Sequence, residues 1–248
     1  MCILAWNWQP DSDTPLLLIA NRDEFYDRPA LATHWWHGGK MLAGKDLHAG
    51  GSWLGVNRDK KMAALTNYRD LSAARSDAPS RGDLVCNFLN QNGSARAYLE
   101  NLKSVSDLYN PFNLLLFDGH DLLGFESRNR KILTFEQGIG AVSNADFHSN
   151  WPKHQNLKNN FSRLIYALEN ENDAYYAILK DENKASYLDL PETGLPVDVE
   201  HALSSVFIRI PGYGTRVSSI LKITKNFTIT SERSYDFNGF ISEVNHIY

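Results

Sequence analysis

Short apolar runs and turn residues alternate through the first third of the chain. An apolar run over residues 2–6 is followed by the turn cluster 10–13 and by a second apolar run over 16–20. Apolar runs of this length on either side of Pro, Asp and Ser are typical of a β-hairpin. We therefore expect two paired strands, with Cys2 at one end of their sheet. A third apolar run, 62–65, predicts another buried strand.

The second half of the chain changes first to a helical pattern and then back to strands. Pro152 predicts a helix start, because proline is favoured in the first turn. Apolar residues then recur at helical spacing, at positions 157, 161, 164, 165 and 168. Strands are expected over 206–208, 217–223 and 227–231. Strands, helices and strands in this order indicate an α+β fold, and the lack of repeats or a long linker predicts one domain over residues 1–248.

Composition and charge narrow the function classes. The chain has 248 residues, 43% of them hydrophobic and 22% charged, which is typical of a globular protein with a large core. A formal net charge of −4, with Lys and Arg scattered, argues against a nucleic-acid partner. No apolar run approaches the ~20 residues of a transmembrane helix, and the start of the chain lacks the pattern of a signal peptide. We expect a cytoplasmic protein without a membrane span.

The chain has two cysteines, Cys2 and Cys86. Two cysteines can build neither a disulfide scaffold nor, alone, a structural zinc site, and no His-x-x-x-His motif suggests another metal centre. Cys86 lies on the apolar face of an expected helix and is predicted to be a packed thiol. If Met1 is removed, Cys2 gains a free α-amine, with an ordinary pKa of ~7.7–8.0, that can act as the base for its own thiol. The alternative is that Cys2 is not a nucleophile and is only a small apolar residue at the start of a strand.

Four consecutive polar residues, Asn21 to Glu24, directly follow the second apolar run. Arg22 could lower the pKa of a neighbouring thiol, and a carboxylate such as Asp23 could hold an ammonium group. A solvated turn is the alternative explanation of this segment. The sequence leaves open which of the four side chains faces Cys2.

Two asparagines and an arginine near the end of the chain complete the set of candidate catalytic residues. Asn67 and Asn144 each follow an apolar run. An amide N–H beside a nucleophile stabilises a developing oxyanion, and loss of such a donor costs ~2.7–4 kcal/mol. Arg216 precedes the expected strand 217–223 and could supply a second positive charge. Taken singly, these residues also fit ordinary turn and strand-edge positions.

In their order along the chain, these motifs resemble those of the NRDE family, also called the transport and Golgi organisation protein family. The motifs are Cys2, Asn21–Phe25, Ala49–Gly55, Ala64–Arg69, Val142–Asn144, Trp151–Lys153 and Tyr213–Arg216. The resemblance covers nearly the whole chain and implies a four-layer αββα sandwich of the N-terminal-nucleophile hydrolase type. The sequence is more distantly similar to choloylglycine hydrolases and penicillin V acylases. That similarity implies catalytic positions at Cys2, Arg22, Asp23, Asn67, Asn144 and Arg216.

One functional hypothesis is a cysteine amidohydrolase acting on a small non-peptide amide. Cys2 would be the nucleophile and its α-amine the base, so that hydrolysis needs no cofactor. Asn67 and Asn144 would bind the oxyanion, and Arg22 or Arg216 would steady the charge.

The alternative hypothesis is a non-catalytic protein on the same scaffold. The resemblance implies haem binding and trafficking, or binding of acyl-CoA or lipid. His34 and His37 flank two tryptophans, and imidazole can bind haem iron. Because the chain has no Cys-x-x-Cys-His motif, such haem would be held non-covalently. A surface loop with aromatic anchors explains the same segment, and an adaptor with a relic site is a third possibility.

Overall fold

The computed structural model describes residues 2–36, 38–70 and 75–248. Their contacts group them into two compact units, each made of separate chain segments. The first unit contains the chain up to Asp27, Gln137–Ser143 and His148–Tyr248, and the second contains Arg28–Glu136 and Asn144–Phe147. Because both units are discontinuous in sequence, this grouping does not by itself define two domains, and one domain over residues 1–248 stays a prediction.

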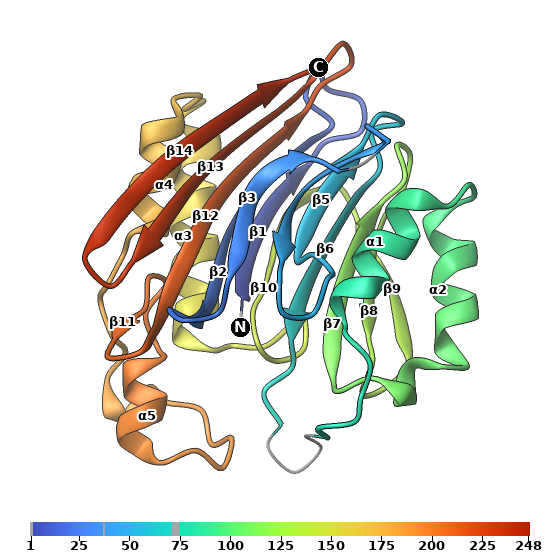
Figure 1. Cartoon of the computed structure of the whole chain (residues 1–248). Helices are drawn as coiled ribbons and strands as arrows, with labels where there is room; N and C mark the ends of the chain where they lie inside the picture. Colours follow the sequence, from blue (N-terminus) through green and yellow to red (C-terminus); the bar gives the residue numbers. More distant parts are fainter. Residues whose placement is uncertain (1, 37, 71–74) are drawn as a thin grey trace. The chain divides into compact units, whose positions relative to one another are not determined.

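The first unit is built on an antiparallel sheet with the strand order β10-β1-β2-β12-β13-β14, and β11 pairs with β12 (Figure 1). Its strands are β1 (Cys2–Trp8), β2 (Leu16–Phe25), β10 (Gly138–Val142), β11 (Arg209–Ile210), β12 (Tyr213–Ile223), β13 (Thr228–Asp236) and β14 (Gly239–Ile247). Its helices are α3 (Pro152–Tyr166), α4 (Asn172–Leu179) and α5 (Val197–Ala202), with a 3₁₀ turn, η3 (Tyr187–Asp189).

Helices α3 and α4 cover one face of this sheet (Figure 1). Ile3 and Ile19 of the sheet are fully buried against Leu157 and Phe161 of α3. Side chains of alternate strand residues point to opposite faces, so the odd-numbered residues of β1 and β2 make this core. Burial of such a side chain contributes about 1.5–3 kcal/mol, which fixes both the register and the helix-covered face.

The predicted hairpin and the predicted helix start are confirmed. β1 and β2 pair antiparallel, and Pro152 is at the first position of α3. Two details of the pattern are wrong. Leu168 lies beyond the end of α3 and is 83% exposed, because the chain leaves the helix there with a φ of 56°. The segment 206–208 is buried but forms no strand, and only Arg209–Ile210 pairs with β12.

The second unit is built on a second antiparallel sheet, in the order β3-β4-β5-β6-β7-β8-β9. Its strands are β3 (Ala30–Trp35), β4 (Met41–Asp46), β5 (Leu54–Asn57), β6 (Met62–Asn67), β7 (Phe112–Phe117), β8 (Leu122–Glu126) and β9 (Lys131–Thr134). Helices α1 (Gly82–Asn90) and α2 (Ala95–Lys103), followed by the 3₁₀ turn η2 (Ser106–Leu108), pack on one face of it. The core between them includes Phe88 and Leu99 from the helices and Leu114 from the sheet, all fully buried.

Helices that cover antiparallel sheets confirm the predicted α+β class. Cys86 is half-buried in α1 and packs against the core of the second unit, as expected. Within the described residues, no helix is both long and apolar enough to cross a membrane.

Gly140 of β10 provides a test of the first sheet. It pairs with Trp6 of β1, and a Cβ at this position would run into the buried indole ring. We expect Gly140→Ala to lower the free energy of unfolding by about 1–3 kcal/mol, because the core is forced apart. Urea denaturation measures this change. Gln137→Ala, at an exposed position just before β10, is the control, and equal stability of the two variants would contradict the packing described here.

Candidate active site

The pairing of β1 with β2 places Cys2 directly opposite Arg22. Opposite residues of an antiparallel pair have their side chains on the same face, and successive residues alternate. Cys2, Arg22 and Glu24 therefore belong to the face opposite the one that α3 and α4 cover. Arg22 Nη2 lies 3.9 Å from Glu24 Oε2, and only 5% of the Arg22 side chain is exposed. The expectation of a solvated turn at residues 21–24 is wrong, because β2 continues through them to Phe25.

Asn21 lies on the helix-covered face and has a structural role. Its Nδ2 donates hydrogen bonds to the carbonyl oxygens of Leu179 (2.8 Å) and Val206 (2.9 Å). Its Oδ1 accepts a 2.6 Å hydrogen bond from Ser218 Oγ. These contacts satisfy a buried amide and attach the end of α4 and the segment after α5 to the sheet.

Asp23 is fully buried and is held by Thr215 of β12. Thr215 Oγ1 donates a 2.7 Å hydrogen bond to Asp23 Oδ1 and accepts a 2.9 Å hydrogen bond from the backbone N–H of Ile208. A buried carboxylate is costly unless hydrogen bonds or charges compensate it. The Thr215 hydroxyl supplies one such bond and fixes the orientation of the Asp23 carboxylate. Asp23 lies at the same end of the sheet as Cys2.

The environment of Cys2 favours the neutral thiol. Burial raises the pKa of the Cys2 thiol above its ordinary value, and the negative charges of Asp23 and Glu24 raise it further. The Arg22 guanidinium lowers this pKa, as the sequence predicted, but does not outweigh burial. A thiol in this state needs a base before it can act as a nucleophile.

Arg216 occupies a β-bulge rather than a position before the strand. Thr215 pairs with Asp23 and Val217 pairs with Arg22, so Arg216 is the extra residue between them. Its Nη1 donates to the carbonyl oxygens of Phe25 and Tyr26, each at 2.9 Å, and its Nε donates to that of Tyr235 at 3.2 Å. Burial lowers the pKa of Arg216, and the like charge of Arg22 lowers it further. The bulge thus brings a second cation near Arg22.

Asn67 and Asn144 meet in the second unit. Asn67 ends β6, and Asn144 Nδ2 donates a 2.9 Å hydrogen bond to its carbonyl oxygen. The Asn144 carbonyl in turn accepts a 2.8 Å hydrogen bond from the N–H of Arg69. Asn144 is fully buried. The six predicted residues therefore form two sets: Cys2, Arg22, Asp23 and Arg216 in the first unit, and Asn67 with Asn144 in the second.

The sequence prediction missed Glu24 as a site residue. Both Asp23 and Glu24 follow the apolar run, but alternation along β2 places Glu24, and not Asp23, on the same face as Cys2 and Arg22. The sequence indicates Glu24 only if the second predicted strand is continued through the polar residues 21–24, as β2 does in the structure. Thr215 was also missed, because it contacts Asp23 from a position 192 residues further along the chain.

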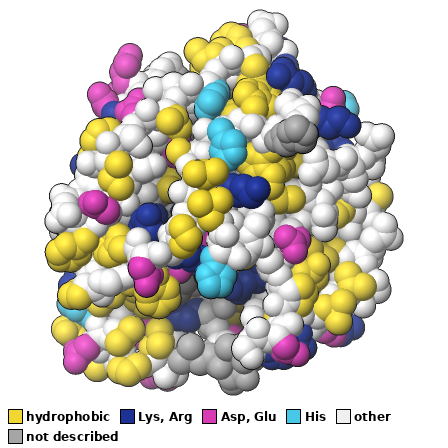
Figure 2. All heavy atoms as spheres, viewed as in Figure 1, with side chains coloured by type: hydrophobic (Ala, Val, Ile, Leu, Met, Phe, Trp, Pro, Cys, Tyr) yellow, Lys and Arg dark blue, Asp and Glu magenta, His cyan; other side chains and the backbone are white. Residues whose placement is uncertain are grey.

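The histidine pair proposed for haem is only partly described. His34 lies in β3, where its Nδ1 and the carbonyl oxygen of Ala32 are 2.7 Å apart, whereas His37 lies outside the described residues. Among the residues that the structure describes, no three His, Cys, Asp or Glu side chains group closely enough to hold a metal ion. On the face shown in Figure 2, Lys and Arg side chains are interspersed with Asp and Glu side chains.

Comparison with known proteins identifies the family. The sequence pattern of the family "Transport and Golgi organisation 2" matches residues 1–236. The chain belongs to this family. It is 32% identical to the Transport and Golgi organization protein 2 homologs of Bos taurus and Homo sapiens, with 94% of this chain and 93% of each homolog covered. The Drosophila melanogaster protein is 26% identical, with 90% and 88% covered. The family resemblance inferred from the sequence is confirmed at this level.

One solved structure is similar in fold to this chain, and it has an N-terminal-nucleophile hydrolase fold. The C2A mutant of conjugated bile acid hydrolase from Clostridium perfringens superposes with a TM-score of 0.53 at 10% identity, covering 100% of this chain and 96% of that one. An N-acylethanolamine-hydrolyzing acid amidase ortholog from Caenorhabditis elegans gives a TM-score of 0.48 at 12% identity, covering 89% and 92%. The first of these similarities supports the predicted fold.

The charges around Cys2 make a testable prediction for this family member. Below the raised pKa the thiol is protonated and unreactive, so alkylation of Cys2 should speed up as pH rises through that pKa. Glu24→Gln removes a charge that raises the pKa and should shift the alkylation profile to lower pH. Arg22→Gln removes a charge that lowers the pKa and should shift it to higher pH.

Mass spectrometry of iodoacetamide-labelled peptides separates Cys2 from Cys86 and gives both profiles from one sample. Glu243→Gln, which alters a carboxylate on the edge strand β14, is the matched control and should leave the Cys2 profile in place. Shifts of the same sign in the Glu24 and Arg22 variants would contradict the arrangement described here.

Proposed function

We propose that this protein is a cysteine N-terminal-nucleophile amidohydrolase that acts on a small non-peptide amide. The observation that carries the proposal is the position of Cys2, at the end of β1 and directly opposite the buried Arg22. A thiol held at a strand end under the influence of the Arg22 guanidinium and of two carboxylates, Asp23 and Glu24, has the components for nucleophilic catalysis. The raised pKa of Cys2 makes the reaction depend on a base.

The proposed base is the α-amine that Cys2 gains when Met1 is removed. This amine takes the thiol proton, and the sulfur attacks the amide carbonyl carbon to form a tetrahedral intermediate. The C–N bond then breaks, and the leaving amine takes the proton from the α-ammonium group. The resulting thioester is hydrolysed by water, which restores the thiol and releases a carboxylic acid.

The neighbouring charges receive separate roles in this proposal. Glu24 and Asp23 stabilise the α-ammonium group while it holds the proton. Arg22 stabilises the negative sulfur, and Arg216, whose charge acts on Arg22, adds to the positive charge available for the substrate. No step requires a cofactor.

Asn67 and Asn144 are proposed as the oxyanion donors. An asparagine amide has two N–H donors, and one of those on Asn144 binds the Asn67 carbonyl. Asn144 follows two residues after the end of β10, the strand that pairs with β1. A donor that is already ordered by hydrogen bonds loses little freedom when the oxyanion forms.

The structure of the conjugated bile acid hydrolase supports the proposal at the level of fold. The conjugated bile acid hydrolase was crystallised as its C2A mutant, so a cysteine also occupies its second position. Because the catalytic thiol must stay reduced, we also propose that this protein works in the cytoplasm. Cys2 and Cys86 do not form a disulfide with each other.

Replacement of Cys2 tests the proposed activity. We expect protein lacking Met1 to release 7-amino-4-methylcoumarin from small N-acyl amides of that dye, and Cys2→Ala and Cys2→Ser to reduce the release by at least about 10³-fold. Cys86→Ala should retain activity. Intact mass establishes whether Met1 is absent from each preparation. Release that persists in both Cys2 variants, or no release across a panel of acyl chains from protein lacking Met1, would contradict the proposal.

Haem binding or trafficking, and acyl-CoA or lipid binding, stay predictions. His34 is the described haem candidate, and its Nδ1 contact with a carbonyl oxygen leaves Nε2 as the ligating nitrogen. The cavity beside it has about 180 Å³, below the roughly 300–1,000 Å³ of pockets that bury drug-sized ligands. A porphyrin bound through His34 would therefore extend beyond this cavity, and hydrolysis is the function that we favour.

Titration with haemin tests the haem alternative directly. If His34 binds the iron, the wild-type protein should shift the Soret band saturably at micromolar concentration, and His34→Ala should lose the shift. The same titration of Cys2→Ala shows whether the thiolate contributes. A wild-type protein that leaves the Soret band unchanged removes the haem alternative.

A further inference from the structure

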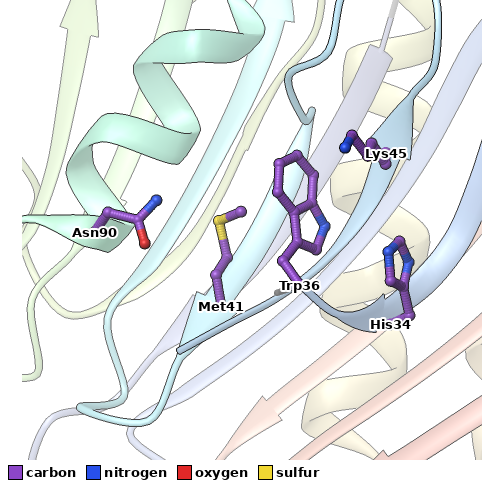
Figure 3. Close-up of a pocket in the computed structure, with 5 residues that line it drawn as sticks. All are labelled: His34, Trp36, Met41, Lys45 and Asn90. Carbon is purple, nitrogen blue, oxygen red and sulfur yellow. The ribbon is translucent and has the colours of Figure 1, made fainter. Parts of the chain in front are cut away.

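A cavity lies in the second unit, and none of the residues that line it takes part in the proposed hydrolase mechanism. It has about 180 Å³ and is lined by His34, Trp36, Met41, Lys45 and Asn90 (Figure 3). Four of these residues belong to β3, β4 and the turn between them, and Asn90 ends α1. Because β3 is the edge strand and α1 packs on β4, β5 and β6, the helix layer stops beside this cavity.

Trp36 forms a fixed wall of the cavity. Its backbone N–H donates a 2.8 Å hydrogen bond to the Met41 carbonyl, and its Nε1 donates a 3.0 Å hydrogen bond to the Ala43 carbonyl. Both bonds tie the indole to β4. The ring therefore presents its apolar surface without a large loss of side-chain entropy when a ligand packs on it.

Size and surface favour one aromatic ring. A cavity of about 150 Å³ lined by apolar side chains is large enough for benzene, so about 180 Å³ accommodates a ring with one small substituent. Trp36 supplies an aromatic face for stacking. Figure 3 shows the Met41 side chain on the side of Trp36 that faces Asn90, and a thioether makes favourable contacts with aromatic rings.

Charge favours an anion. Lys45 is the one formally charged residue among the five, and its Nζ lies 4.9 Å from the centroid of the Trp36 ring. The His34 ring is nearly parallel to the indole, at 17° and 6.3 Å between centroids. Asn90 adds an amide whose Nδ2 donates to the Cys86 carbonyl at 2.9 Å. The ammonium beside an aromatic wall is suited to a carboxylate attached to a ring.

We propose that this cavity binds a small aromatic carboxylate. The ring packs against Trp36 and Met41, and the carboxylate accepts a hydrogen bond from the Lys45 ammonium. The site is independent of Cys2 and therefore goes beyond the proposed hydrolysis. It gives the protein a second, non-catalytic site for a monoanion of the size of benzoate.

Calorimetric titration with benzoate tests the site. We expect saturable binding to the wild-type protein, about tenfold or more weaker binding to Lys45→Gln, and unchanged binding to Lys40→Gln, because Lys40 is an exposed lysine outside the lining. Benzylamine, which has the same ring and the opposite charge, should not bind saturably. Equal benzoate binding by Lys45→Gln, or no saturable benzoate binding by the wild type, would overturn the proposal.

Two further measurements keep this result separate from folding and from hydrolysis. Amide chemical shifts of the wild-type protein should change on benzoate addition around Trp36 and Lys45, and a change confined to other residues would contradict the site. Cys2→Ala should bind benzoate as the wild type does. Loss of benzoate binding in Cys2→Ala would place the ligand at the proposed catalytic residue instead, whereas loss of hydrolysis alone leaves this second site in place.

Discussion

The antiparallel register of β1 against β2 is the constraint on which the candidate active site depends. Because Cys2 pairs with Arg22, the first described residue of the chain is held opposite a buried cation. The register cannot slip by one residue, since that would exchange Ile3 and Ile19 of the helix-covered core with the opposite face. The hydrophobic core of the first unit thus determines which polar side chains share a face with the thiol.

This placement puts several charged and polar groups out of water, and the structure satisfies them with specific contacts. Asp23 is held by Thr215, and Asn21 by two carbonyl oxygens and a serine. The bulge at Arg216 turns an extra cation toward carbonyl groups at the end of β2. Buried polar groups with defined partners are rigid, and rigidity is what a catalytic group needs if its geometry is to persist between turnovers.

The two units carry different chemistry. In the first, burial and carboxylates raise the pKa of the Cys2 thiol. In the second, an edge strand and a helix end leave a small cavity whose wall is aromatic and whose charge is positive. The two proposals follow from this difference: hydrolysis of an amide in which Cys2 of the first unit is the nucleophile, and binding of an anion in the second unit.

The sequence by itself determined the α+β class, the β1–β2 hairpin, the start of α3 at Pro152 and the family, because these follow from local periodicity, turn residues and ordered motifs. It could not determine which of residues 21–24 faces Cys2. That choice depends on strand alternation and on the register with β12, whose residues lie nearly 200 positions away. The direction in which the pKa of the Cys2 thiol shifts, and the bulge at Arg216, were likewise decided only by the tertiary structure. Burial and strand pairing are properties of the packed sheet and not of any local segment.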